Sequence, residues 1–362
     1  MNNNYCLIMA GGAGVRFWPV SKKHKPKQFI DILGCGQTFL QMTFSRFEKI
    51  CPKENIFIAT NEIYKNLVKE QIPGISDNNI LCEPAKRNTA PCIAYANYKI
   101  KSLNPNATIV VAPSDHLILK EDKFLDVVKT SMEAATNNEW LITIGIQPNN
   151  PNTGYGYIQF DENYVYAHDN NLKKVVTFTE KPPLELAKKF LQSGDFLWNA
   201  GIFIWNINAA MNAIKKYQPE MDTIFAAGVG KYNTPDEQTF INNVYTECNN
   251  ISIDYGVMEK ADNVYVRSSE FGWSDLGTWG SLYDTLQKDN NDNAVIGNNV
   301  LTYDTKNCVI NMPKNKLTVV QGLDDFIIAE DNNILLICKK EDEQQIRQFV
   351  SDVEISKGEQ FV

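Results

Sequence analysis

The sequence predicts an α/β protein with a mixed, mainly parallel sheet, followed by a small β-rich C-terminal unit. Three observations lead to this fold class. Short apolar strands alternate with longer amphipathic segments up to about residue 150. Strands joined by turns then follow. Beyond an Asn-, Asp- and Gly-rich segment at 290–299, five short strands occur with only turns between them.

The first part contains five expected strands, at residues 5–10, 55–60, 79–84, 108–113 and 141–146. They are apolar along most of their length, which is typical of strands buried on both faces of a parallel sheet. Helical spacing of apolar residues at 37–50 and 123–138 predicts helices between strands. In such βαβ arrangements ligands bind at the carboxyl ends of the strands.

The second part predicts strands at 155–160, 164–169, 174–182 and 198–206, a helical block over about 209–260, and a strand at 264–269. Residues 290–299 have the composition of a linker. Strands are expected at 300–305, 308–312, 317–322, 326–331 and 334–339, with a terminal amphipathic helix at 343–353. We therefore expect two domains, 1–290 and 291–362, the second compatible with a β-helix.

Composition excludes several classes of protein. The net charge of −8 opposes a general nucleic-acid surface. The eight cysteines form no CxxC pair and the chain has three histidines, so zinc ligation and a disulfide framework are disfavoured and a reducing cytoplasm is expected. No apolar run is long enough to span a membrane, and the N-terminus enters a strand without a charged leader.

A glycine-rich turn, GGAGVRF, follows the first strand. Phe17 replaces the third glycine of a dinucleotide fingerprint, and no GK[ST] follows Gly14, so the turn is neither a dinucleotide loop nor a Walker A loop. A tight turn with solvated lysines would explain the glycines alone. The basic island that follows, Arg16, Lys22, Lys23, Lys25 and Lys27, favours a small anionic ligand. Arg16 and Lys27 are candidates to hold phosphates, together with backbone N–H groups.

Two carboxylates, Asp115 and Asp275, also follow expected strands. One such residue alone is most often a helix cap. Two near a phosphate site would suit Mg²⁺, which takes few protein ligands and completes its octahedron with phosphate and water.

Glu83 lies in the polar turn CEPAKRNTAPCIA, where Asn88 or Thr89 would equally serve as a helix cap. A buried carboxylate can accept hydrogen bonds from N1–H and the exocyclic amine of guanine, whereas adenine presents an acceptor at N1. Preference for guanine over adenine would follow. Glu180, Lys181 and Asn199, in FTEKP and WNAGIF, could similarly bind sugar hydroxyls, although turn chemistry explains Pro182 and Gly201.

Together, GGAGVRFWPVSKKHKPKQF, EPAKRNTAPCIA, APSDH, TGYGYI, FTEKP, WNAGIF and WSDLGTW resemble the mannose-1-phosphate guanylyltransferases, or GDP-mannose pyrophosphorylases. The resemblance runs from the first strand to about Trp279, and the β-rich tail continues it. Small departures occur at Phe17 and at Ala85-Lys86, and neither removes a charge of the expected site. The chain is too short for the isomerase domain of many relatives, so no isomerase activity is expected.

The resemblance implies a Rossmann-like nucleotide-diphospho-sugar transferase domain, a C-terminal left-handed β-helix-like domain and a homodimer. It implies GMP transfer from GTP to mannose 1-phosphate with Mg²⁺. It assigns catalytic roles to Arg16, Lys27 and Lys181, nucleotide binding to Ala10, Gly11, Gly12, Gly14, Glu83, Asn88, Thr89 and Ser114, sugar-phosphate binding to Gly154, Tyr155, Glu180, Lys181 and Asn199, and metal binding to Asp115 and Asp275.

Three other functions remain open from the residues. The glycine turn alone would allow a nicotinamide dehydrogenase, against which the basic, Pro-interrupted segment after it counts. A non-catalytic nucleotide-sugar sensor could use the same scaffold, but it could dispense with Asp115, Asp275 and Lys27, which are all present. The sugar 1-phosphate could also differ from mannose, as in a manno-heptose phosphate.

Overall fold

The computed structural model describes residues 3–12 and 14–362, which form two compact units. The large unit comprises residues 3–11, Thr43–Ser114 and Ile118–Trp273. The small unit comprises Gly12–Met42, Asp115–Leu117 and Ser274–Val362. Three short elements span the changes from one unit to the other along the chain: α1 (Phe39–Phe47), β5 (Leu117–Ile118) and β11 (Trp273–Ser274). The expected domain boundary at 290/291 stays a prediction.

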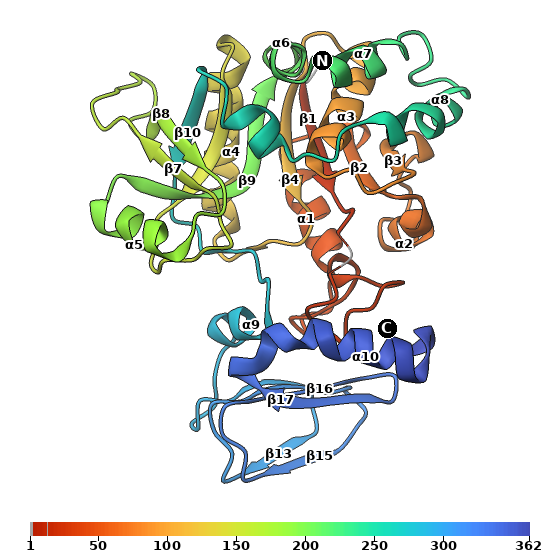
Figure 1. The fold of residues 1–362 in the computed structure, drawn as a ribbon, viewed down its shortest axis with the longest axis vertical. Coiled ribbons are helices and arrows are strands. Elements are labelled where there is room, and N and C mark those ends of the chain that lie inside the picture. Colours follow the sequence, from red (N-terminus) through yellow and green to blue (C-terminus); the bar gives the residue numbers. More distant parts are fainter. Residues whose placement is uncertain (1–2, 13) are drawn as a thin grey trace. The chain divides into compact units, whose positions relative to one another are not determined.

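The large unit is organised around a sheet whose described strands follow the order β3-β2-β1-β4-β9-β6-β10-β8-β7 (Figure 1). These strands are β1 (Asn4–Met9), β2 (Ile56–Asn61), β3 (Ile80–Glu83), β4 (Thr108–Pro113), β6 (Leu141–Ile146), β7 (Tyr157–Phe160), β8 (Leu172–Thr179), β9 (Phe196–Asn206) and β10 (Val264–Ser268).

The sheet is mixed, as predicted. Strands β1 to β4 pair in parallel, and so do β6 and β10. The long strand β9 runs antiparallel to β4 and β6 between them. Because β1, β3 and β4 are parallel, Gly11, Glu83 and Ser114 lie at the same edge of the sheet, the edge where α/β proteins bind ligands.

Helices pack on both faces of this sheet because alternate strand residues point to opposite sides and both sides are apolar. Tyr5 and Leu7 of β1 belong to a core that includes α3, α6 and α7, while Cys6 and Ile8 are buried on the other side. The helices are α2 (Lys65–Gln71), α3 (Thr89–Leu103), α4 (Glu121–Asn137), α5 (Leu184–Ser193), α6 (Ile207–Tyr217), α7 (Pro219–Ala226) and α8 (Glu237–Val244).

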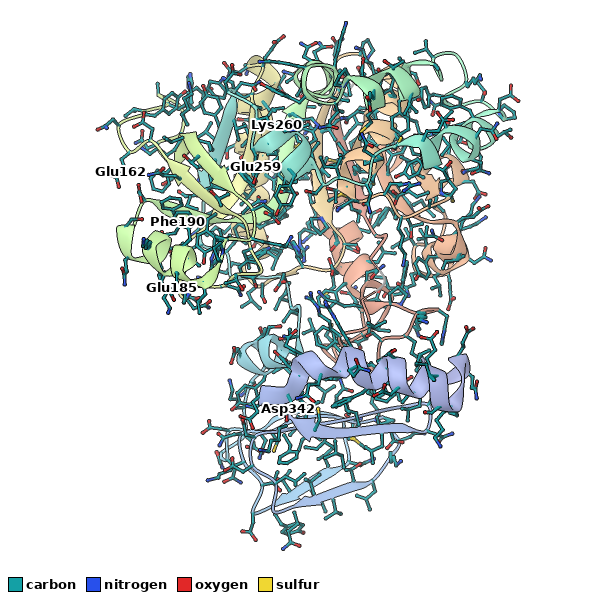
Figure 2. All side chains as sticks on the ribbon, viewed as in Figure 1. Glu162, Glu185, Phe190, Glu259, Lys260 and Asp342 are labelled. Atoms are coloured by element: carbon teal, nitrogen blue, oxygen red, sulfur yellow. The ribbon has the colours of Figure 1, made fainter. Side chains whose placement is uncertain are left out.

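Short helical turns complete the large unit. The 3₁₀ turns are η2 (Lys53–Asn55), η3 (Glu62–Tyr64), η4 (Asp77–Asn79) and η5 (Tyr245–Glu247), and η6 (Asp254–Met258) is a π-helical turn. On α5, Phe190 stacks on Phe196 of β9 with ring centroids 4.0 Å apart, which fixes this outer helix (Figure 2).

The small unit has a β-helix-like core of parallel rungs. Strands β12 (Ala294–Ile296), β14 (Val309–Asn311) and β16 (Phe326–Asp331) pair in parallel, β17 (Ile334–Lys339) adds antiparallel to β16, and β13 (Val300–Tyr303) pairs with β15 (Thr318–Gln321). Helix α10 (Ile346–Lys357) packs on them through Ile346 and Val350 (Figure 1). The unit also contains α9 (Trp279–Thr285) and the 3₁₀ turns η1 (Lys27–Phe29), η7 (Lys340–Gln345) and η8 (Glu359–Phe361).

Two expectations from the sequence were wrong. Residues 164–169 form turns and not a strand. Tyr164 and Tyr166 pack edge-to-face on Tyr265 and Trp140, so these aromatic residues reflect packing of a loop and not strand pairing. The expected linker at 290–299 contains β12, because Ala294 is buried in the core of the small unit.

A buried ion pair ties the helical block of the large unit to α3. Lys99 is 3% exposed, and its ammonium lies 2.8 and 2.6 Å from the two carboxylate oxygens of Glu237. Tyr95 Oη donates to the same carboxylate over 2.5 Å, and the backbone N–H of Asn233 donates to it over 2.5 Å. Breaking such a pair leaves an uncompensated buried charge.

We therefore expect Glu237→Gln to lower the free energy of unfolding by roughly 3–5 kcal/mol in urea titrations. Replacing both partners, Lys99→Met with Glu237→Leu, should cost much less because no charge stays buried alone. Glu185→Gln is the matched control. The Glu185 side chain is 81% exposed beside Lys188 (Figure 2), and such surface ion pairs contribute at most about 1 kcal/mol. Equal losses for the single and double variants would contradict this role of the pair.

Candidate functional site

In the small unit a buried lysine joins three distant chain segments. Lys27 is 5% exposed, and its Nζ lies 3.0 Å from Asp115 Oδ2 and 2.5 Å from the backbone carbonyl oxygen of Asp275. The Nζ also lies 5.1 Å from the centroid of the Phe39 ring. Burial raises the pKa of Asp115, but the charge of Lys27, the neighbouring His116 and the hydrogen bonds to the carboxylate together lower the pKa below its usual value.

Arg16 belongs to the same cluster. A Cβ atom on Gly277 would lie 2.9 Å from Asp275 Oδ2 and 3.1 Å from Arg16 Nη1. Gly277 thus leaves room for a carboxylate and a guanidinium to approach the chain. Between Asp275 and Gly277, buried Leu276 has φ of +41°, a conformation that a branched residue adopts only when its surroundings impose it. We call Arg16, Lys27, Asp115 and Asp275 the Lys27 cluster.

The glycine turn lies directly against this cluster. A Cβ on Gly14 would lie 3.1 Å from Lys27 Cβ, and Gln28 Nε2 donates to the Gly12 carbonyl over 2.8 Å. Two other lysines of the basic island have side-chain partners in the small unit. Lys22 pairs with Asp331 of β16 over 3.0 Å, and Lys23 pairs with Glu354 of α10. Lys25 is exposed, and its backbone pairs with that of Lys22. Arg16 and Lys27 stay the predicted anion-binding residues of the island.

The donor atoms of the Lys27 cluster fit a magnesium ion. Among the residues that the structure describes, no three His, Cys, Asp or Glu side chains come together as a self-sufficient metal site. The Asp115 carboxylate contacts the buried Lys27 ammonium, and the Asp275 carboxylate lies with Arg16 beside Gly277, next to the carbonyl that binds the same lysine. Mg²⁺ typically uses one or two carboxylates and completes its shell with substrate phosphates and water.

Glu83 lies at the end of β3 in the large unit and is 9% exposed. The two oxygens of its carboxylate have different neighbours. Oε1 accepts a hydrogen bond from the phenol of Tyr245. Oε2 points toward Gly11, on which a Cβ would lie 3.2 Å away. Burial raises the pKa of Glu83 to about 7, although the hydrogen bond from Tyr245 lowers it.

The neighbouring turn shows that the capping interpretation of Asn88 was right. Asn88 is the N-cap of α3 with φ of +65°, and its side chain accepts from the Thr89 N–H over 2.9 Å. The Thr89 hydroxyl accepts from the Ile253 N–H over 2.9 Å. Both side chains therefore shape the turn beside Glu83, and their contact with a ligand stays a prediction.

Ala10 and Ser114 follow β1 and β4, and both are buried. The Ala10 N–H donates to the Ala59 carbonyl over 2.7 Å, and the Ser114 N–H donates to the Met9 carbonyl over 3.0 Å. Their backbone donors are therefore engaged in extending the sheet.

A second carboxylate site in the large unit joins β7, β8 and β9. The Glu180 side chain is 8% exposed; Oε1 pairs with Lys181 Nζ over 2.5 Å, while Oε2 is buried without a hydrogen-bond partner among the described residues. Gly156 is required here, because a Cβ would collide with Glu180 Oε2. An unpaired buried carboxylate oxygen is costly in isolation and well suited to accept a ligand hydroxyl.

Asn199 on β9 connects this site to a residue that the sequence analysis missed. Asn199 Oδ1 accepts from Thr143 Oγ1 over 2.8 Å, which orients its Nδ2 toward Asp254 Oδ1, also at 2.8 Å. Burial and the nearby Glu180 raise the pKa of Asp254 to about 6. The sequence signal was the carboxylate in NNISIDYG, within a block that we interpreted only as helical.

Tyr155 and Gly154 form the loop before β7. The Tyr155 ring contacts Trp198 and Trp273 edge-to-face at 5.0 and 5.2 Å, and its carbonyl accepts from the Lys181 N–H over 3.2 Å. Lys181 has φ of +47° at this contact. The Glu180 N–H donates to Glu259 Oε1 over 3.0 Å (Figure 2). Gly154 is exposed, and its N–H donates to Asn152.

The structure thus groups the predicted residues into three sets. The Lys27 cluster lies in the small unit; Glu83 with its turn, and Glu180 with Lys181 and Asn199, lie in the large unit.

Comparison with family models gives two matches. A model described as nucleotidyl transferase matches residues 5–292. A model described as MannoseP isomerase/GMP-like beta-helix domain matches residues 297–353. The second match agrees with the parallel rungs of the small unit.

Individual proteins are similar over nearly the whole chain. Mannose-1-phosphate guanylyltransferase of Escherichia coli is 31% identical, covering 97% of this chain and 75% of that protein. Mannose-1-phosphate guanylyltransferase 2 of Escherichia coli O157:H7 is 33% identical, covering 98% and 74%. A crystal structure described as mannose-1-phosphate geranyltransferase from Thermus thermophilus superposes with a TM-score of 0.86 at 27% identity, covering 97% of this chain and 99% of that one.

The raised pKa of Glu83 predicts a pH-dependent stability difference. An acid whose pKa is raised on folding stabilises the fold fully below its unfolded pKa, and this contribution is lost as pH rises through the folded pKa. For Glu83 the loss runs from about pH 4.5 to above pH 7 and amounts to at most roughly 3 kcal/mol.

Glu83→Gln lacks this titration, so its stability relative to the unchanged protein should increase between pH 5 and pH 8. Urea unfolding at both pH values measures the effect, with the exposed Glu70→Gln as the control. A stability difference that is the same at pH 5 and pH 8 would contradict the raised pKa.

Proposed function

Because the chain belongs to the nucleotidyl transferase family, and within it to the mannose-1-phosphate guanylyltransferases, we propose that it transfers GMP from GTP to α-D-mannose 1-phosphate, giving GDP-mannose and pyrophosphate. The observation that carries this proposal is the Lys27 cluster. A buried ammonium, an arginine and two carboxylates meet there beside a glycine turn. This set of groups suits a polyphosphate that binds together with a divalent cation.

The proposed reaction is one displacement at the α-phosphorus of GTP. A phosphate oxygen of mannose 1-phosphate forms a bond to this phosphorus, and the bond to the β-phosphate oxygen breaks with its electron pair leaving on pyrophosphate. A sugar phosphate is largely dianionic at neutral pH, so no general base is needed. The barrier lies in bringing two polyanions together in line.

Cationic side chains would lower this barrier. Arg16 and Lys27 would hold GTP phosphate oxygens beside the backbone of Gly11, Gly12 and Gly14, and Lys181 would hold the sugar phosphate. Lys27 is buried, so its charge is weakly screened and already oriented before the substrates bind.

Asp115 and Asp275 would hold Mg²⁺. The bound ion would neutralise phosphate charge and stabilise the departing pyrophosphate. Their support is that the Asp115 carboxylate and the Asp275 carbonyl both contact Lys27, while the Asp275 carboxylate lies with Arg16 beside Gly277.

Recognition of the two substrates would use the large unit's carboxylates. Glu83 would accept from guanine N1–H and the exocyclic amine, with Asn88, Thr89, Ala10 and Ser114 shaping the turn around the nucleoside. Glu180 Oε2, buried and without a hydrogen-bond partner among the described residues, would accept a mannose hydroxyl. Gly154, Tyr155 and Asn199 would line the same subsite.

We further propose a homodimer that acts in the cytoplasm and binds neither nucleic acid nor membrane. Apolar side chains on the outer face of the small unit support the dimer: Leu301, Val319 and Leu317 are 50–68% exposed. All eight cysteines are free, which suits a reducing compartment. Within the described part of the chain, no helix is both long and apolar enough to cross a bilayer.

The test is pyrophosphate release measured over a grid of the four nucleoside triphosphates and several sugar 1-phosphates. We expect the highest kcat/KM for GTP with mannose 1-phosphate. A higher value with a manno-heptose phosphate would replace the sugar assignment. No release with any pair would overturn the enzyme assignment in favour of a nucleotide-sugar sensor.

Asp275→Asn should leave the fold intact and lower turnover by roughly 10²-fold or more, the scale of losing one group that stabilises transition-state charge. The control is Asp284→Asn, the same change at an exposed position on α9. Near-normal turnover of the Asp275 variant at saturating Mg²⁺ would rule out the metal role.

A further inference from the structure

The orientation of Glu83 depends on a residue far along the chain. Tyr245, at the start of η5, is fully buried and donates its phenolic hydrogen to Glu83 Oε1. This leaves Oε2 directed toward Gly11, where a Cβ would lie 3.2 Å from it. The two oxygens of one carboxylate therefore have different surroundings, and the Tyr245 hydroxyl determines which oxygen faces Gly11.

Tyr245 is itself held by contacts on both sides. Gln238 Nε2 donates to the Cys82 carbonyl over 3.0 Å, which ties α8 to β3 one residue before Glu83. Arg87 Nη2 donates to the Thr246 carbonyl over 2.6 Å, which ties η5 to the turn after β3. The Tyr245 ring packs edge-to-face on Phe225 at 6.2 Å. The phenol is thus a fixed donor.

The protonation state of a carboxyl group determines which base it complements. An ionised carboxylate only accepts hydrogen bonds, so it suits the N1–H and amino donors of guanine. A protonated carboxyl presents one donor and one acceptor, the pattern that pairs with N1 and the amino group of adenine. A donor fixed on Glu83 favours the ionised form.

In the described part of the chain, the titratable groups that interact electrostatically with Glu83 are the Tyr245 phenol and the thiols of Cys82 and Cys92. All three are neutral at pH 7 because burial raises their pKa values. Among the described residues, Tyr245 is the side chain that lowers the pKa of Glu83.

We propose that Tyr245 is a positioning residue for base selection, which orients the Glu83 carboxylate and keeps it in the form that accepts guanine. This inference rests on the proposed function of Glu83 in binding the base. It adds a specificity determinant contributed by the helical block, outside the turn that carries Glu83.

The experiment compares kcat/KM for GTP and ATP, each with mannose 1-phosphate, in Tyr245→Phe and the unchanged enzyme. We expect the GTP/ATP ratio to fall about tenfold or more at pH 7, the scale of one hydrogen bond to a charged group. The GTP/ATP ratio should recover partly at pH 9, because Glu83 ionises at that pH even without the hydrogen bond from Tyr245. Tyr232→Phe is the matched control, since its buried hydroxyl donates to the Phe225 carbonyl over 2.6 Å in the same block.

Two further variants separate positioning from a structural role. Glu83→Gln combined with Tyr245→Phe should have the same GTP/ATP ratio as Glu83→Gln alone, because Tyr245 acts through Glu83. Tyr245→His, which keeps a donor, should retain more selectivity than Tyr245→Phe and serves if the Phe variant is unstable. An unchanged GTP/ATP ratio, or equal losses for both nucleotides at every pH, would overturn the proposal.

Failure of the proposed function can be distinguished from failure of the proposed role of Tyr245. If the unchanged protein releases no pyrophosphate, the same ratio is measured as competition of GTP and ATP for a fluorescent guanine nucleotide. Loss of binding selectivity in Tyr245→Phe would then support base selection without catalysis, and an unchanged selectivity would overturn it.

Discussion

The buried ammonium of Lys27 is the interaction that brings distant segments of the small unit together and on which the proposed chemistry depends. An isolated ammonium in such a place would carry a desolvation penalty of several kcal/mol, so its partners must be present in the folded chain. Asp115 supplies the carboxylate and Asp275 the carbonyl oxygen, from segments about 90 and 250 residues away along the chain. The same constraint fixes the Asp115 carboxylate and the Asp275 main chain around Lys27, so the proposed phosphate and metal site would be assembled before any ligand binds.

Strained backbone coincides with the proposed chemistry. Asn88, Lys181 and Leu276 all have positive φ, between +41° and +65°, and each costs about 1–3 kcal/mol unless its surroundings compensate. Local hydrogen bonds hold each one: to Thr89, to Tyr155 and to Ser274 respectively. Each of these three residues is, or lies beside, a residue assigned to a ligand, whereas other residues with positive φ, such as Asn233 and Asp325, lie elsewhere.

The fold class could be predicted because the apolar strands are local patterns, and β4 and β6 occupy the predicted residues. The carboxylates and Lys27 could be found because each follows a strand or a glycine turn. Tyr245 and Asp254 could not be singled out in this way. Each contacts a predicted site residue, Glu83 or Asn199, that is distant from it in sequence. The sequence could not show for the same reason that Lys22 and Lys23 of the basic island form ion pairs. Their partners, Asp331 and Glu354, lie in the C-terminal strands and helix.

The central claim is a single displacement at the α-phosphorus of GTP, and isotope transfer tests it most directly. With GTP labelled at the α-phosphate, the account predicts that all label enters the sugar nucleotide, while label at the γ-phosphate leaves in pyrophosphate. Labelled pyrophosphate should not exchange into GTP without mannose 1-phosphate, because no guanylyl-enzyme forms. Exchange in the absence of the sugar phosphate, or α-label retained on the protein, would contradict the account.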